Sequence, residues 1–478
     1  MKNDPIFRLS ATELADKVRK RELSPREILG VFLDRIADVN PAINAFCTIA
    51  AEQAQAQAKE AEASVMKRRK LGPLHGVPVS IKDSVFTKGI RSTIGSRLYA
   101  DFVPKKDAVV VERLKKAGAI ILGKTNTPEF CLMATTDNLL FGVTRNPWNT
   151  DYTPGGSSGG AAAATAACLS PISIGSDGGG SIRVPGSFCG VFGLKPSHGR
   201  VPQYPNFPGW DTTGIITTGP LTRTVEDAAL ALQVIAGVHS RDRDSLPGKP
   251  PDFLSTLNSG VKGLKIAWSA DLGYAKVDPQ VLRITEKAAA VFKALGSAVT
   301  PVNPKGKTLL GDYFAIVGVC HAESLNDVLK KRRSDIHHSV AFFVEGTEDL
   351  PAVAYEKSRA EQSRYWNQLA PFFEIYDVLL TPTVAVPPFR IGEREPAPMA
   401  SYRGLVIDWE NFDDWLPFTY PFNITGQPAA TVPCGFTSEG LPIGLQIVGR
   451  RHDEMTVLRV AAAFERAMPW RDKYPPVG

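Results

Sequence analysis

Two glycine-rich clusters constrain the backbone of this chain more than any other feature. The first covers residues 154–160 and has the sequence PGGSSGG, and the second covers residues 175–185 and has the sequence GSDGGGSIRVP. Glycine adopts backbone dihedrals that a Cβ forbids, so such runs can turn several N–H groups into one cavity. Converging N–H groups suit an oxyanion, and Ser181 ends the second run where a nucleophile would face them. Together with Lys82, which closes an apolar run upstream, the clusters indicate hydrolysis without histidine.

Strand and helix patterns alternate along the chain. This alternation predicts an α/β fold in which a large, open, mixed β-sheet is surrounded by helices. We find no internal repeat and no flexible linker, so we expect residues 1–478 to form a single domain. The expected strands are residues 77–82, 119–122, 172–174, 265–268, 378–380, 429–433 and 443–448, and the expected helices include residues 12–21, 25–39, 51–70, 109–117, 161–168, 224–236, 279–295 and 454–467.

Composition excludes several classes of function. The net charge of +6 is a weak field for a chain of this length, and the basic clusters at residues 67–70 and 330–333 are short, so we expect no nucleic-acid partner. The six cysteines form no C-x-x-C pair, and the adjacent His337 and His338 point to different helix faces, so we expect no metal and no cofactor. We find neither a signal-peptide pattern nor a run of about 20 apolar residues, which predicts a cytoplasmic protein without a membrane segment.

Two familiar motifs match the sequence but not its context. Residues 118–125 fit the phosphate-loop pattern G-x-x-x-x-G-K-[ST], yet a helix precedes the first glycine and the interior residues form a predicted buried strand. Residues 155–159 fit the nucleophile elbow G-x-S-x-G, but residues 151–154 before it are not a strand. We therefore favour neither a nucleotide site nor a histidine-dependent hydrolase.

The ordered set of motifs resembles the amidase signature family. In that family the nucleophilic serine follows a bridging serine by 24 residues, which is also the separation of Ser157 and Ser181. The resemblance is strong over residues 72–236 and 418–464 and weak between them, so residues 72–236 would be the core that carries the catalytic residues and residues 240–415 a variable, substrate-side region. Further matches are residues 73–78, 123–126, 193–196, 219–221, 421–423, 426–428 and 440–444.

The resemblance implies an amidohydrolase that works through a Ser-cisSer-Lys triad and an acyl-enzyme, and that releases a carboxylic acid and an amine or ammonia. Ser181 would attack the amide carbonyl, and Ser157, after a cis bond from Gly156, would pass the proton to Lys82. Lys82 can act as a base only when it is neutral, and burial favours the neutral amine. Taken singly, either serine could instead cap a helix and the lysine could extend from a strand end toward water.

The same resemblance assigns supporting roles around the second cluster. The expected oxyanion-hole donors are the N–H groups of Gly178, Gly179, Gly180 and Ser181, and the family usually has threonine at position 178. The residues expected to organise the loop are Ser158, Asp177 and Arg183. Asp83 is expected to be structural, because a carboxylate touching Lys82 would raise the pKa of the lysine.

The substrate side is less constrained by the sequence. Residues 131–135 are expected to form one wall of the acyl pocket, with Met133 facing the substrate. Phe207 and Trp210 either pack in a surface loop or form an aromatic rim. Because no arginine cluster is available for an anion, we expect a small, uncharged or aryl amide as the substrate, with esters or carbamates as side reactions, and a monomer or homodimer.

One alternative comes from the same family. The chain could be the amidase (A) subunit of a glutamine-dependent aminoacyl-tRNA amidotransferase. That subunit usually carries a Ser-Ser-Leu-Asp-type stretch before Gly-Pro-Leu, whereas residues 214–218 of this chain are GIITT. The difference favours the free enzyme.

Overall fold

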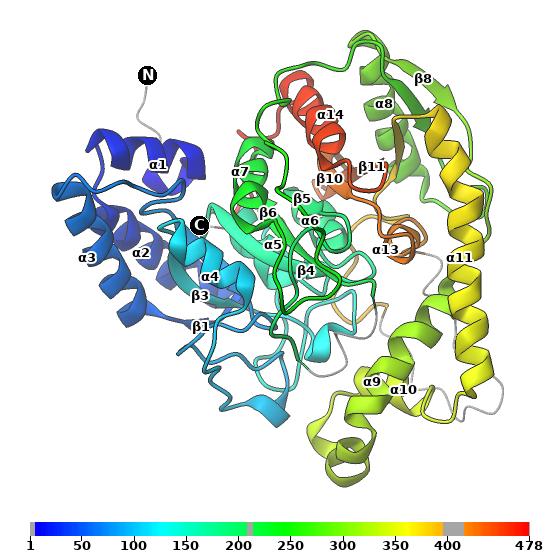
Figure 1. Cartoon of the computed structure of the whole chain (residues 1–478), viewed down its shortest axis with the longest axis horizontal. Helices are drawn as coiled ribbons and strands as arrows, with labels where there is room; N and C mark the ends of the chain where they lie inside the picture. The colour runs from blue at the N-terminus through cyan, green and yellow to red at the C-terminus, as the bar shows by residue number, and fades with distance from the viewer. Residues whose placement is uncertain (1–4, 208–213, 395–414, 478) are drawn as a thin grey trace.

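An 11-stranded mixed sheet forms the centre of the computed structural model, which describes residues 5–207, 214–394 and 415–477. The predicted α/β fold with a large mixed sheet is confirmed. Figure 1 shows helices α1–α3 at one side of the sheet and α9–α11 at the opposite side. In sheet order the strands are β1 (Phe46–Ile49), β3 (Ile120–Thr125), β2 (Pro78–Lys82), β4 (Ile172–Asp177), β6 (Thr217–Thr222), β5 (Phe192–Lys195), β10 (Ala429–Phe436), β11 (Pro442–Gly449), β9 (Val378–Pro382), β7 (Lys265–Trp268) and β8 (Ala298–Pro301).

The helices begin where the sequence places capping residues. Ser24 caps α2 and pairs with Glu27 in a capping box, as its Ser-Pro-Arg-Glu sequence predicts, and Ser10 with Glu13 does the same for α1. The helices of the described chain are α1 (Ala11–Lys20), α2 (Pro25–Ile43), α3 (Ala51–Met66), α4 (Val109–Lys116), α5 (Gly159–Ala166), α6 (Arg183–Cys189), α7 (Val225–Ile235), α8 (Pro279–Ala294), α9 (Leu310–Arg332), α10 (His338–Glu345), α11 (Ala352–Ile375), α13 (Pro421–Ile424) and α14 (Glu454–Ala467).

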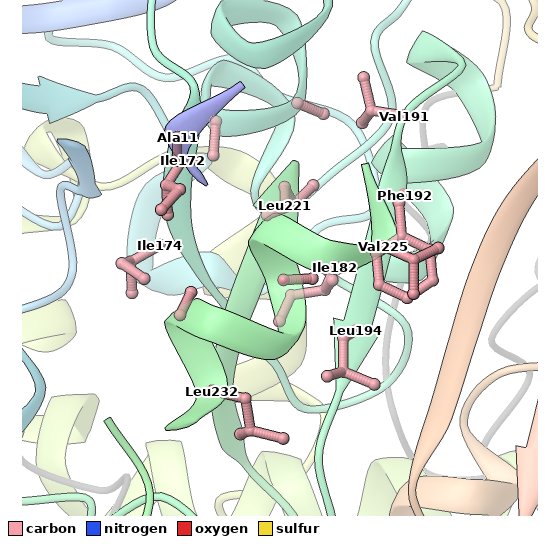
Figure 2. Close-up of a cluster of buried hydrophobic side chains, with 14 of the residues drawn as sticks. Ala11, Ile172, Ile174, Ile182, Val191, Phe192, Leu194, Leu221, Val225 and Leu232 are labelled. Carbon is pink, nitrogen blue, oxygen red and sulfur yellow. The ribbon is translucent and has the colours of Figure 1, made fainter. Parts of the chain in front are cut away.

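The core nearest the glycine clusters is packed between α7 and the central strands. Figure 2 shows Leu221 of β6 and Leu194 of β5 beside Val225 and Leu232 of α7, and all four side chains are fully buried. Burial of each such side chain contributes on the order of 1.5–3 kcal/mol. Helix α5 is enclosed on all sides, because its alanines let β2 and β4 approach closely. These contacts fix the backbone on which both serine clusters are carried.

Strand β6 was not predicted from the sequence. Gly219 and Pro220 argue against a central strand, yet β6 pairs with β4 along its whole length and Pro220 lies opposite Ile174.

Strand β3 lies where a phosphate loop would have to be. The ammonium group of Lys124 is buried there and contacts Val85 O and Thr87 Oγ1, so it holds protein backbone rather than a phosphate.

The described ranges contain no helix long and apolar enough to cross a bilayer. They also contain no group of three or more histidine, cysteine, aspartate or glutamate side chains placed to hold a metal ion.

Candidate functional site

Strand pairing places Lys82 beside the second glycine cluster. β2 and β4 are parallel neighbours with Ile81 opposite Ile174, so the last residue of β2 lies next to the end of β4, where the cluster begins. The Lys82 side chain is fully buried. The sheet thus carries a lysine amine into a closed interior next to a serine-rich loop.

Three serine hydroxyls surround the Lys82 amine. Nζ lies 2.7 Å from Ser157 Oγ, 2.9 Å from Ser158 Oγ and 3.0 Å from Ser176 Oγ. Ser158 Oγ also contacts the Ser176 carbonyl at 3.1 Å, and because a carbonyl only accepts, the Ser158 hydroxyl must donate to it. Ser158 can therefore only accept from Lys82. A neutral Lys82 amine that donates one N–H to Ser158 Oγ and one to Ser176 Oγ keeps its lone pair. That lone pair can accept the Ser157 hydroxyl proton.

The environment of Lys82 favours the neutral amine. Burial lowers the pKa of Lys82, and the nearby Cys131 thiol and the Asp177 carboxylate oppose this without cancelling it. The Asp83 carboxylate accepts hydrogen bonds from Thr93 N and Oγ1 and from Gly95 N and does not bind the Lys82 amine. Asp83 thus has the structural contacts that the sequence suggested.

The first cluster is tied directly to the second. The Gly156–Ser157 peptide bond is cis, and Ser157 is 1% exposed. Ser158 N donates to Ser181 O at 3.0 Å, which joins the two serine loops through their backbones. Neither serine caps α5 through its side chain, so the helix-capping alternative fails. Both hydroxyls are instead directed at the lysine.

Ser181 lies on the wall of the same cavity as Ser157. No hydrogen bond joins the two hydroxyls in this structure, although catalytic hydrogen bonds often tighten only once substrate is bound.

The oxyanion-hole prediction needs one correction. Gly180 N donates to Asp177 Oδ1 at 2.8 Å, so this N–H is held by the loop and is not free for a substrate. Within the described chain no acceptor engages the N–H groups of Gly178, Gly179 and Ser181.

Asp177 organises the loop of residues 178–181, which is called the oxyanion loop below after its predicted role. Its carboxylate accepts from Gly180 N and Ile182 N and forms a two-point ion pair with Arg183, at 2.9 and 3.0 Å, with both side chains fully buried. Asn423 of α13 donates to the same carboxylate at 2.9 Å. Burial alone would raise the pKa of Asp177, but the Arg183 charge and these hydrogen bonds outweigh it and hold the pKa well below its usual range. The loop is thus built around a permanent carboxylate.

The cavity at Ser181 is mostly apolar. It encloses about 770 Å³ between its walls, the part open to solvent included. Its described wall carries no aspartate, glutamate, lysine or arginine. The lining residues are Phe130, Cys131, Leu132, Met133, Ala134, Gly156, Ser157, Ser176, Gly178, Gly179, Gly180, Ser181, Val184, Ile215, Ile216, Leu310, Tyr313, Phe314, Val317, His321, Phe343, Leu416 and Tyr420.

The residues that the sequence predicted to contact the substrate do not all lie on the cavity wall. Met133 lies on the cavity wall together with three of its neighbours in residues 131–135. Phe207 is instead 1% exposed and packs edge-on against Phe86 and Tyr99, outside the cavity wall, because these rings bury one another. Trp210 lies outside the described residues.

Several site residues were missed by sequence reasoning. Ser176 belongs to the second cluster but received no role, although it contacts Lys82. The wall supplied by α9 has a recognisable signal, because Leu310, Phe314, Val317 and His321 recur at helical spacing. That spacing indicates one face of a helix, but it cannot say what the face covers.

Comparison with known proteins identifies the class. The family model described as Amidase matches residues 27–458. The chain therefore belongs to the amidase family, and it is a hydrolase that acts on the carbon–nitrogen bond of amides.

Its relatives cover nearly the whole chain. An acylamidase of Rhodococcus erythropolis is 40% identical over 474 residues, which is 98% of this chain and 97% of the relative. The A-type subunit of a glutamyl-tRNA(Gln) amidotransferase from Geobacillus thermodenitrificans is 38% identical over 98% of this chain and 99% of its own. The structure of a bacterial aryl acylamidase of the amidase signature family superposes with a TM-score of 0.89 at 32% identity, covering 98% of each chain. A 6-aminohexanoate cyclic dimer hydrolase superposes with a TM-score of 0.91, also at 32% identity, over 98% of this chain and 99% of its own.

Proposed function

We propose that the enzyme hydrolyses small, uncharged, largely apolar amides, aryl amides included, through Ser181, Ser157 and Lys82. Ser181 Oγ attacks the carbonyl carbon, its proton passes to Ser157, and the Ser157 proton passes to the Lys82 lone pair. Free N–H groups of the loop, from Gly178, Gly179 and Ser181, hold the oxyanion.

The second half of the cycle uses the same groups in reverse. The carbon–nitrogen bond breaks as Lys82 returns its proton through Ser157 to the leaving nitrogen, which departs as an amine or ammonia. Water then attacks the Ser181 ester and releases the carboxylic acid. Ser158 and Ser176 hold the amine throughout, since each accepts one of its N–H bonds.

The observation that carries this proposal is the wall around Ser181. It joins the serine-bound Lys82 amine, whose pKa burial lowers, to an apolar cavity with no charged side chain among the described residues. Free glutamine carries both an ammonium and a carboxylate, and burying either charge without a partner is costly. The same wall therefore argues against the amidotransferase alternative, despite the 38% identity to one such protein.

A substrate screen tests the proposal. We expect hydrolysis of anilides and aliphatic amides by the chain alone, with little or no release of ammonia from glutamine. The Ser181→Ala variant should lose turnover by about 10⁴-fold or more while keeping its melting temperature. Glutaminase activity that appears only with added amidotransferase subunits would support the alternative, and retained turnover in Ser181→Ala would remove Ser181 as the nucleophile.

A further inference from the structure

One polar group on the cavity wall is used by neither the fold nor the proposed mechanism. His321 of α9 is 2% exposed and lines the cavity. Its Nδ1 lies 2.8 Å from Val317 O, one turn back on the same helix. Its Nε2 is buried and has no hydrogen-bond partner among the described residues. A buried polar atom without a partner costs free energy, so its retention calls for an explanation.

The proton positions on this ring follow from its one contact. A carbonyl only accepts, so Nδ1 carries the proton that it donates to Val317 O. Burial lowers the pKa of His321, which keeps the ring neutral, and Nε2 then presents a lone pair. Because Nδ1 faces the backbone of its own helix, Nε2 lies on the ring edge turned away from it. The unpartnered atom of this cavity-lining residue is thus a hydrogen-bond acceptor.

His321 lies further along α9 than the residue of this helix that reaches the oxyanion loop. On the same helix, the Tyr313 side chain reaches the oxyanion loop, where its ring atoms lie close to Gly179. His321 is eight residues further along α9, which is about 12 Å along the helix axis. The wall between the two is apolar and includes Phe314 and Val317.

We propose that the substrate carries a hydrogen-bond donor, a hydroxyl or an N–H, at the far end of an apolar segment, and that His321 Nε2 accepts it. This deepens the proposed function and depends on it, because it names the class of amide for the same site. His321 is then a specificity residue: it selects alcohols, phenols or terminal N–H groups over their methyl-capped analogues.

Binding to the inactive Ser181→Ala variant tests this without turnover. The probes are acetanilides with a para hydroxyl, hydroxymethyl or hydroxyethyl group, phenylacetamides with the same groups, and the methyl ether of each. One alcohol of the series should place its hydroxyl at the right distance and on the right side of the amide. We expect that alcohol to bind about five- to tenfold more tightly than its methyl ether, which is the ratio that one buried neutral hydrogen bond predicts. The ratio should fall to near one when His321→Phe is added and be partly kept with His321→Gln.

A matched histidine supplies the control. His198 also contacts a carbonyl through Nδ1, that of Ile216 at 3.3 Å, but its ring is not on the cavity wall. His198→Phe in the same background should leave the ratio unchanged. Equal binding of alcohol and ether at every length, or a ratio that survives His321→Phe, would overturn the proposal.

A spectroscopic measurement covers the case in which His321→Phe fails to fold. In the Ser181→Ala protein, the ¹⁵N resonance of His321 Nε2 should move when the preferred alcohol binds and stay in place when its ether binds. An unmoved resonance with bound alcohol would contradict the proposal. Failure of the proposed function is a separate result, since it would appear as absent amide turnover by the enzyme that retains Ser181.

Discussion

At the scale of single residues, burial rather than sequence neighbourhood sets the chemistry of Lys82. Its amine is enclosed by three hydroxyls, and the nearest acid along the chain, Asp83, is occupied by Thr93 and Gly95. A carboxylate in contact would have favoured the ammonium. Burial therefore favours the neutral form of Lys82, which the proposed mechanism requires.

The pH dependence of the rate follows from this environment. Below the pKa of Lys82 the ammonium cannot accept a proton, so kcat/KM should rise with pH and level off above the lowered pKa. Lys82→Arg should cost about 10²–10⁴-fold, because a guanidinium stays charged. Both are measured as pH–rate profiles on an anilide.

A second buried lysine means that the pH–rate profile needs a control. Burial lowers the pKa of Lys195 to about 7, so this group also titrates near neutrality. Its Nζ contacts Pro196 O and is not on the cavity wall. Lys195→Met should keep the alkaline rise, and a rise that disappears in this variant but persists in Lys82→Arg would reassign the base.

At the scale of elements, the site depends on segments distant in the sequence. Helix α13 carries Asn423 to the Asp177 carboxylate. The Oδ1 atom of Asn423 also accepts a hydrogen bond from Arg183 Nη2 at 2.5 Å. Helix α9 carries Tyr313 to the same loop, beside Gly179. The oxyanion loop is thus contacted by two helices from the C-terminal half of the chain.

The contact between α9 and the loop predicts the effect of a single methyl group. A Cβ on Gly179 would lie 2.7 Å from Tyr313 Cζ and closer still to its hydroxyl, so Gly179→Ala must displace the loop or the ring. Since losing one oxyanion donor costs about 10²–10³-fold in kcat, we expect a loss of that order with KM little changed. Adding Tyr313→Ala should restore part of kcat. A Cβ on Gly178 would lie 3.2 Å from its nearest neighbour, Ile216 Cγ1. Gly178→Ala should therefore lower kcat less than Gly179→Ala does, and equal losses in the two variants would contradict this account.

At the scale of the whole molecule, one buried and one partly buried acid join the two ends of the chain. Asp227 of α7 accepts from the first N–H groups of α1, Ala11 N and Thr12 N, each at 2.9 Å. Glu465 of α14 accepts from Val225 N at 3.1 Å, and Arg471 contacts Glu13 of α1. Burial raises the pKa of Asp227 to about 6 and that of Glu465 to about 7.

These raised pKa values predict how stability changes with pH. Between the ordinary glutamate value of 4.5 and about 7, folded Glu465 binds a proton that the unfolded chain has lost, so the free energy of unfolding falls as pH rises through this window. Glu465→Gln removes the penalty and should stabilise the protein by about 1–2 kcal/mol at pH 8, with the advantage shrinking toward pH 5. Thermal unfolding at both pH values checks this. A variant that melts lower than the parent protein at pH 8 would show that the ionised carboxylate stabilises the fold.

The sequence by itself determined the local part of this protein. Periodicity and capping residues are properties of neighbouring positions, which is why the α/β alternation and the start of α2 at Ser24 followed from the chain alone. The glycine clusters and Lys82 could be named because their order and spacing are written in the sequence. Strand β6 could not, since its Gly-Pro pair looks like a turn until β4 pairs with it.

Only the tertiary structure decided which groups face the cavity and which are already occupied. Gly180 N is held by Asp177, Phe207 is buried among other rings, and His321 lies on the wall with a free lone pair. The sequence contains all three residues, but hydrogen-bond occupancy and burial depend on partners from other elements. Those partners meet only when the strands pair and α9 comes to line the cavity, so the substrate side of the site had to come from the fold.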